Sequence, residues 1–164
     1  MAKGDIQPYQ NAGANKTDGS IKAVVASGTT ASINAGEPVV KTVAGVAAKL
    51  AATADPNTTN RIVGVAASAS TETASVSGLV DVIPVNPGQI WMIAPKVAAS
   101  WNTQATYNAR IGKRYSLDLT GGVFTIDTTD GATNGMIVEY IDVARYPGMV
   151  AFSWSPSWDY RLAA

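Results

Sequence analysis

Residues 114–127 read Arg-Tyr-Ser-Leu-Asp-Leu-Thr-Gly-Gly-Val-Phe-Thr-Ile-Asp, and this stretch decides the fold class. The apolar side chains of Tyr115, Leu117 and Leu119 alternate with polar ones, which is the period of two that a half-buried β-strand requires. The adjacent glycines of Thr120-Gly121-Gly122 supply the positive φ angles that a tight hairpin turn needs. The stretch therefore predicts two antiparallel strands joined by a short turn.

Similar short β-branched runs, separated by Gly, Pro, Asn and Asp, continue along the chain from Ile21 onward. Many short strands at intervals of about ten residues are typical of a β-barrel or a β-sandwich. We expect strands at residues 21–26, 38–43, 46–51, 62–67, 79–85, 89–93, 114–119, 123–127, 136–143 and 149–154.

Two further turns and one helix complete the expected secondary structure. Ala44-Gly45 is expected to turn one strand back into the next. Tyr146-Pro147-Gly148-Met149 has the chemistry of a type II turn, because Pro sets φ at the second position and Gly allows a positive φ at the third. Residues 94–105 begin near a proline suited to an early helix position and carry apolar residues at helical spacing, which predicts a helix.

The composition excludes several classes of function. The 164 residues include no Cys and no His, so the chain has no disulfide, thiolate nucleophile or imidazole base. Twelve basic and twelve acidic residues give zero net charge, which leaves no electrostatic footprint for nucleic acid. Charged residues are 15% of the chain, and so weakly charged a surface favours association. We therefore expect an assembly component, not an enzyme, with no cofactor or metal; a soluble monomer is the alternative.

No stretch of the sequence is expected to enter a membrane. The longest apolar run, residues 43–54, is Ala-rich, is interrupted by Lys49 and is too short for a bilayer. The first twenty residues lack the apolar region of a secretory signal peptide.

Hydrolytic chemistry in this chain would have to use paired carboxylates, as glycosidases do. The candidates are Asp118, Asp127 and Asp130 around the hairpin, and Glu139 with Asp142 farther along the chain. Alternation places Asp118 on the polar face of its strand, with Arg114 and Ser116, and we expect that face to be solvated. A catalytic acid needs a raised pKa, which a solvated carboxylate does not have. These residues are therefore expected to be ordinary surface charges.

The N-terminal segment differs from the rest of the chain. Residues 1–20 are polar and show no hydrophobic period. They form either a disordered terminus or an extended arm that orders against a neighbour. Ile6 and Tyr9 are the residues expected to anchor such an arm.

The C-terminal segment is rich in aromatic residues. Trp, Tyr and Arg are the types that dominate interface hot spots, and this segment contains Trp154, Trp158, Tyr160 and Arg161. A free aromatic tail would promote aggregation. The tail therefore either folds back over the end of the domain or docks on another chain.

Several short motifs follow one another in an order that resembles the head decoration (cement) proteins of tailed bacteriophages. Residues 34–41, Asn-Ala-Gly-Glu-Pro-Val-Val-Lys, resemble the GxPV strand of that family, and residues 62–68, Ile-Val-Gly-Val-Ala-Ala-Ser, are similar to its hxGhA strand. Residues 78–85, Gly-Leu-Val-Asp-Val-Ile-Pro-Val, are similar to its GxVxV strand. Residues 111–115 and 122–127 also resemble that group. The resemblance spans roughly residues 30–155.

The resemblance implies an all-β protein without catalysis, built as a single β-barrel or β-tulip-like domain. Together with the composition of the two ends, this predicts an extended arm over residues 1–20 and then the domain over residues 21–164, which includes the aromatic tail. The resemblance also implies a homotrimer on the capsid exterior of a virion, made in the host cytoplasm, with the major capsid protein as partner. No nucleic acid or membrane is implied. The resemblance assigns no capsid-contact residue in this chain. The candidate partner-binding residues therefore come from the composition of the two ends: Ile6, Tyr9, Trp154, Trp158, Tyr160 and Arg161.

Two other functions remain open. A carbohydrate-binding or adhesin module would use exposed Trp91, Trp101 or Trp158 to stack on sugar rings. A hydrolase would use the carboxylates named above.

Overall fold

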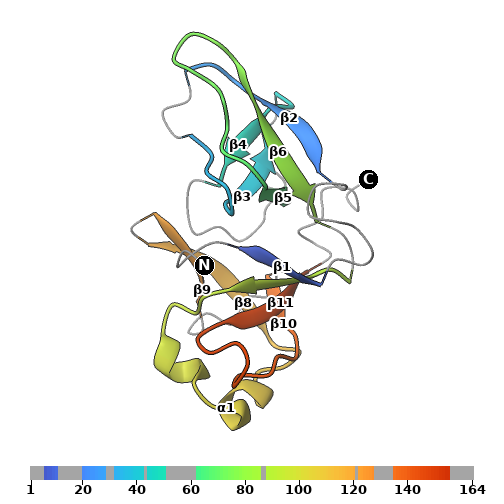
Figure 1. The fold of residues 1–164 in the computed structure, drawn as a ribbon, viewed down its shortest axis with the longest axis vertical. Helices are drawn as coiled ribbons and strands as arrows, with labels where there is room; N and C mark the ends of the chain where they lie inside the picture. Colours follow the sequence, from blue (N-terminus) through green and yellow to red (C-terminus); the bar gives the residue numbers. More distant parts are fainter. Residues whose placement is uncertain are drawn as a thin grey trace.

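The strands of the computed structural model form two groups that are stacked along the long axis of the molecule (Figure 1). The structure describes residues 6–10, 20–28, 32–42, 44–50, 62–85, 88–120, 122–127 and 135–155. The first group is a closed barrel of five strands in the order β2-β4-β3-β5-β6. Its strands are β2 (Ile21–Val25), β3 (Pro38–Lys41), β4 (Ala47–Lys49), β5 (Ile62–Ala66) and β6 (Gly78–Pro84).

The longest pairing in the barrel joins β2 to β6. The two strands run antiparallel from Ile21 opposite Val82 to Val25 opposite Gly78. Val80 and Val82 point into the barrel and are almost fully buried, whereas Leu79 and Asp81, which alternate with them, face outward. This alternation encloses a small apolar core in the barrel, made of Val25, Ile33, Val39, Ala47, Ala66, Val80 and Val82.

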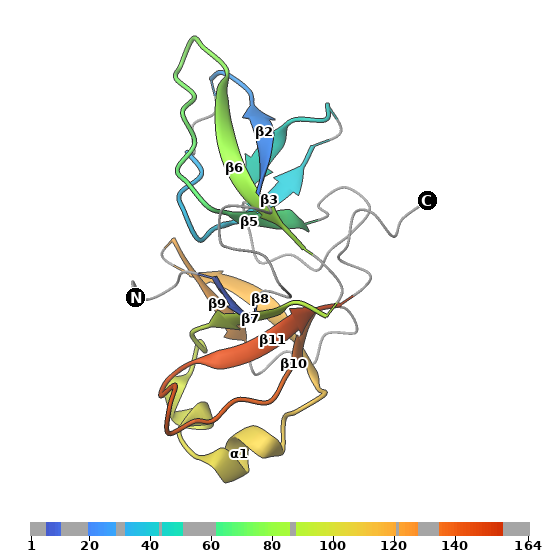
Figure 2. The same ribbon diagram turned by 45° about the vertical axis from the view of Figure 1, so that its right-hand side comes forward.

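The second group is a six-stranded sheet in the order β1-β7-β11-β10-β8-β9 (Figure 2). Its strands are β1 (Gln7–Gln10), β7 (Ile90–Ile93), β8 (Arg114–Thr120), β9 (Val123–Asp127), β10 (Met136–Val138) and β11 (Val150–Trp154). The sheet curls so far that the chain following β7 meets β9. Ala94 accepts a hydrogen bond from the Ile126 N–H, and the Lys96 N–H donates to the Ile126 carbonyl.

The barrel and the sheet share one hydrophobic core. Val40, Ile62 and Val65 of the barrel belong to the same buried cluster as Trp91 and Phe152 of the sheet. Buried apolar surface of this kind is the main favourable term in folding. The two strand groups are therefore held together by a continuous core.

The all-β fold with a closed barrel is confirmed. The structure also contains a second sheet, whose strands the sequence pattern did not distinguish from those of the barrel. The expected strand at residues 136–143 is shorter than predicted, because β10 ends at Val138. The turns behave as predicted: β8 and β9 are joined by two residues, Gly122 has a φ of 80°, and Gly148 has a φ of 72°.

The prediction of one helix over residues 94–105 was wrong. Ala94–Lys96 is extended because it pairs with β9, and the helical residues come later. They form a 3₁₀ turn, η1 (Ala98–Trp101), and one short helix, α1 (Gln104–Asn108). The Thr103 hydroxyl accepts a hydrogen bond from the Thr106 N–H, 3.2 Å away, and so caps α1 where the longer helix was expected to continue.

Two glycines of the family-like motifs sit where the strands approach too closely for a side chain. A Cβ at Gly64 would overlap the Ile83 carbonyl oxygen and the Cγ1 of Val82. A Cβ at Gly78 would overlap the backbone of Thr71 and Glu72. These glycines are needed for space, and neither has a positive φ.

We expect Gly64→Ala to lower the free energy of unfolding by about 2 kcal/mol or more, because the added methyl meets backbone that cannot rotate away. Urea unfolding followed by circular dichroism measures this loss. Gly112→Ala is the control: its Cβ would have open space, and only the φ of 78° opposes it, at a cost of about 1 kcal/mol. Equal losses in the two variants would contradict the steric explanation.

Candidate functional site

The most concentrated group of charges in the sheet is an ion triad formed by Lys96, Asp118 and Asp127. The Lys96 Nζ donates to Asp118 Oδ1 at 3.1 Å and to Asp127 Oδ2 at 2.8 Å. The Thr120 hydroxyl donates to the other oxygen of Asp118 at 2.7 Å. Both aspartates are buried, and Asp118 is only 5% exposed.

The register of the β8–β9 hairpin explains why these side chains meet. Ser116 lies opposite Asp127, and Asp118 lies opposite Thr125, so all four share the face opposite Leu117. The segment following β7 then pairs with β9 and places Lys96 beside them. The prediction that Asp118 is solvated on a polar face was therefore wrong. The alternation was correct, but both faces of β8 are buried.

The charge state of Lys96 limits what the triad can do. Hydrogen bonds to Asp127 and, next, to Asp118 raise the pKa of Lys96 above its ordinary value of 10.5, against an opposing effect of desolvation. At neutral pH Lys96 is an ammonium, which is neither a nucleophile nor a base. It also occupies the space between the two carboxylates, where a glycosidase would hold its substrate. The triad is therefore an arrangement that holds strands together.

The other predicted carboxylates do not form a pair. Glu139 accepts a hydrogen bond from the Ser153 hydroxyl at 2.6 Å. Asp142 Oδ1 accepts from the N–H groups of Ala144, at 3.0 Å, and Arg145, at 3.4 Å, and so stabilises a turn. Asp130 lies outside the described residues. Within the part of the chain that the structure describes, no group of three or more Asp and Glu side chains is placed to hold a metal ion.

Two of the predicted partner-binding residues are buried in their own chain. Ile6 is 2% exposed, and its N–H donates to the Gly36 carbonyl of the barrel at 3.1 Å. Trp154 is 7% exposed and packs edge-on against Phe152, with 5.0 Å between ring centroids. Both side chains are buried against their own chain, and their role in partner binding stays a prediction.

For the remaining four candidates, the structure describes no side chain. Tyr9 belongs to β1, which pairs with β7 of the same chain, but the side chains of β1 lie outside the description. Trp158, Tyr160 and Arg161 also lie outside the described residues. Their role in partner binding stays a prediction.

Two of the three tryptophans proposed for sugar stacking are not on the surface. Trp91 and Trp101 are both fully buried. Trp101 packs edge-on against Tyr107, with 5.2 Å between ring centroids, and the Arg110 guanidinium lies 4.8 Å from the Trp101 ring centroid. These two residues therefore contribute to the core and not to a sugar platform, while Trp158 lies beyond the described part.

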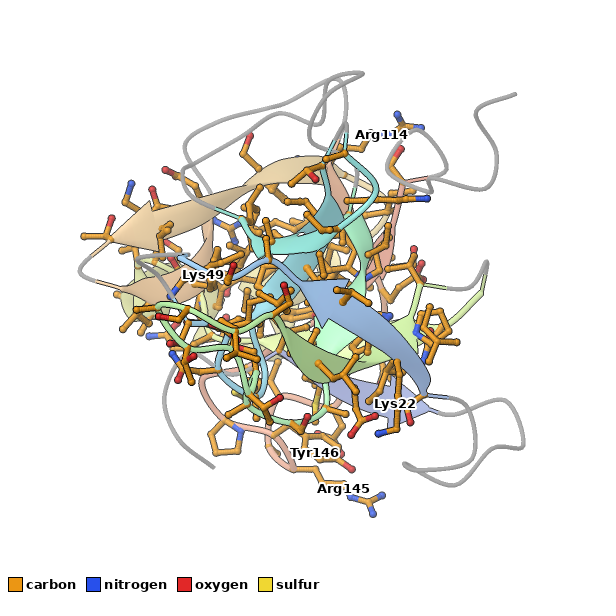
Figure 3. All side chains as sticks on the ribbon, turned by 90° about the horizontal axis from the view of Figure 1, so that it is seen from above. Lys22, Lys49, Arg114, Arg145 and Tyr146 are labelled. Carbon is orange, nitrogen blue, oxygen red and sulfur yellow. The ribbon has the colours of Figure 1, made fainter. Side chains whose placement is uncertain are left out.

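An apolar surface that the sequence reasoning missed lies on the outside of the barrel. Val24 and Leu79 are directly opposite each other on β2 and β6, and they are 50% and 45% exposed. Beside them Lys22 and Asp81 form an exposed ion pair of 2.9 Å; Lys22 lies at the rim of the view in Figure 3. We call these four residues the β2–β6 face. The alternation of Leu79 with Val80 and Val82 was the signal that could have identified it.

We expect Lys96→Met to destabilise the protein more than Lys22→Met, as measured by urea unfolding at pH 7. The first substitution leaves two buried aspartates without their cation, whereas an exposed pair such as Lys22–Asp81 is worth only about 0–1 kcal/mol. Equal effects of the two substitutions would show that the triad has no structural role.

The triad also predicts a dependence on alkaline pH. Because the folded-state pKa of Lys96 is raised, its contribution to stability is complete below about pH 10.5 and is lost as the pH rises through the folded-state value. The difference in unfolding free energy between wild type and Lys96→Met should therefore shrink as the pH rises above about 10.5. A difference that stays constant as the pH rises would contradict the assignment.

No helix among the described residues is long and apolar enough to cross a membrane. Comparison with known proteins adds no family: no family model, no curated protein and no solved structure matches this chain.

Proposed function

We propose that this chain is a structural virion protein that binds the outside of a tailed-phage capsid as a decoration protein. In this proposal it acts as a homotrimer and bridges subunits of the major capsid protein. The observation that carries the proposal is the exposed apolar β2–β6 face on a closed barrel.

The location of the family-like motifs supports this proposal. The three principal motifs, residues 34–41, 62–68 and 78–85, contain β3, β5 and β6, which are neighbours in the barrel. The glycines of two of these motifs, Gly64 and Gly78, are required by the close approach of the backbone around them. The three principal motifs therefore fall on adjacent strands of the barrel, whereas the two shorter ones, residues 111–115 and 122–127, lie around β8 and β9 of the sheet.

The chemistry of the β2–β6 face suits attachment to another protein. Burial of apolar surface gains about 25 cal/mol per Å², and the exposed side chains of Val24 and Leu79, opposite each other on β2 and β6, offer such surface. The charges of Lys22 and Asp81 are already paired, so docking does not leave either charge unmatched. We assign this face to contact with the major capsid protein.

A trimer would strengthen attachment through such small faces. A standard specific interface buries about 1,200–2,000 Å² in total, more than four side chains provide. Linking three copies converts the second and third contacts into intramolecular ones with a high effective concentration. Binding only the assembled shell then stabilises that shell by mass action.

We expect the purified protein to have the mass of three chains by gel filtration with light scattering, and to co-sediment with assembled heads of the virus that encodes it. Val24→Asp should lower the affinity for heads at least tenfold, about 1.4 kcal/mol, because an unpaired carboxylate would be buried in the contact.

Val123→Asp is the matched control, because Val123 is an exposed valine on β9, away from the β2–β6 face. It should leave head binding unchanged. A Val24→Asp protein that binds heads normally would remove the face from the contact, and one that becomes monomeric would assign the face to self-association. A wild-type protein that ignores heads at every concentration would contradict the proposed function itself.

A further inference from the structure

A surface cleft of about 860 Å³ lies at the end of the molecule opposite the barrel. It is formed between η1 with the start of α1 and the connection between β10 and β11, which run beside each other in both ribbon views (Figures 1 and 2). Its volume is within the range of about 300–1,000 Å³ that is usual for small-molecule sites. Its lining includes Asn102, Gln104, Tyr140, Asp142, Val143 and Pro147.

The two walls of the cleft are held together by side chains of α1. The Tyr107 hydroxyl donates to the Glu139 carbonyl at 2.9 Å and accepts from the Ala151 N–H at 2.8 Å. The Gln104 amide donates to the Ile141 carbonyl and accepts from the Val143 N–H, each at 3.0 Å. The cleft is therefore preformed, which lowers the entropic cost of binding a ligand.

Three polar side chains in the cleft have hydrogen-bonding capacity to spare. Among the described residues, none hydrogen-bonds the Asn102 amide or the Tyr140 hydroxyl. Asp142 uses Oδ1 for the turn at Ala144 and Arg145, and its Oδ2 has no partner in the described chain. Tyr140 is also 62% exposed, the largest exposure of any aromatic side chain that the structure describes. Polar groups beside an open aromatic ring are suited to a ligand that is apolar on one face and hydroxylated at its edge.

The charges around the cleft exclude other classes of ligand. Among the described residues, no Lys or Arg lines the cleft, so nothing there would bind a phosphate or a carboxylate. The Arg145 guanidinium stacks on the Tyr146 ring at 5.4 Å instead, and Figure 3 shows both at the outer edge of the molecule. A quaternary ammonium group needs a cage of aromatic rings, and Tyr140 is the one aromatic side chain in the lining.

We propose that this cleft is a binding site for a neutral carbohydrate. The Tyr140 ring stacks on the apolar face of a sugar, and the Asn102 amide and Asp142 Oδ2 hydrogen-bond its hydroxyl groups. Val143 and Pro147 add apolar surface to the lining. This site is separate from the β2–β6 face at the other end of the molecule, and it does not rest on attachment to a capsid.

A glycan array probed with the labelled full-length chain tests the proposal, followed by calorimetric titration of the best neutral glycan. We expect binding to neutral glycans, with a loss of affinity of about tenfold or more in Tyr140→Ala, because the stacking surface is removed. Tyr140→Phe should retain most of the affinity, since it keeps the ring. Asn102→Ala should weaken binding severalfold.

Val123→Ala is the control for loss of an exposed apolar side chain outside the cleft, and it should bind as wild type does. Thermal unfolding of each variant checks that it folds. Choline chloride and inorganic phosphate are titrated as probes of the competing ligand classes.

Three results would overturn the proposal: no neutral glycan bound above background by the folded wild type, glycan binding that survives both Tyr140→Ala and Asn102→Ala, or binding of choline or phosphate at the cleft in place of sugars. Because head co-sedimentation is measured separately, failure here leaves the attachment proposal standing, and failure there leaves this one.

Discussion

The pairing of Ala94–Lys96 with β9 is the contact on which most of the sheet region depends. Two hydrogen bonds to Ile126 turn an open sheet into a curled one and join segments that are about thirty residues apart in sequence. The same pairing delivers Lys96 to Asp118 and Asp127. It also sets the direction in which the chain leaves toward η1 and α1, and so it positions one wall of the cleft.

A continuous core makes the barrel and the sheet mechanically dependent on each other. Ile6 is buried in this core just before β1, while its N–H bonds to Gly36 of the barrel, so the described N-terminal stretch connects both strand groups. Closely packed interiors transmit strain rather than absorb it. A contact on the outside of the barrel is therefore a contact with a rigid body, which is what a protein that bridges other subunits requires.

Local features were predictable from the sequence, whereas features that depend on distant contacts were not. The period of two in residues 114–119 and the glycine turns at Gly122 and Gly148 follow from backbone preferences within a few residues, and they were confirmed. The burial of Asp118 was missed because its covering partner, Lys96, approaches through the pairing with β9. The burial of Trp91 on β7 and of Trp101 in η1 was also missed, because composition does not show which side chains become part of the core. The cleft was out of reach of the sequence, since Gln104 and Tyr107 fix a loop more than thirty residues away.

Several of the charged side chains that the structure describes join separate segments of the chain. Glu37 accepts hydrogen bonds from the Lys49 ammonium at 2.5 Å and from the Asn34 N–H at 2.8 Å, and so joins β4 to the turn that precedes β3. Lys96 likewise joins the segment that follows β7 to Asp118 on β8 and Asp127 on β9. A buried carboxylate with a cation and a backbone donor is satisfied and has little capacity left for a ligand. Among the cleft groups, by contrast, the Asn102 amide and the Tyr140 hydroxyl have no hydrogen-bond partner within the described chain, and neither residue holds the two walls together. Spare hydrogen-bonding capacity in a preformed cleft is therefore a feature that the fold itself does not require.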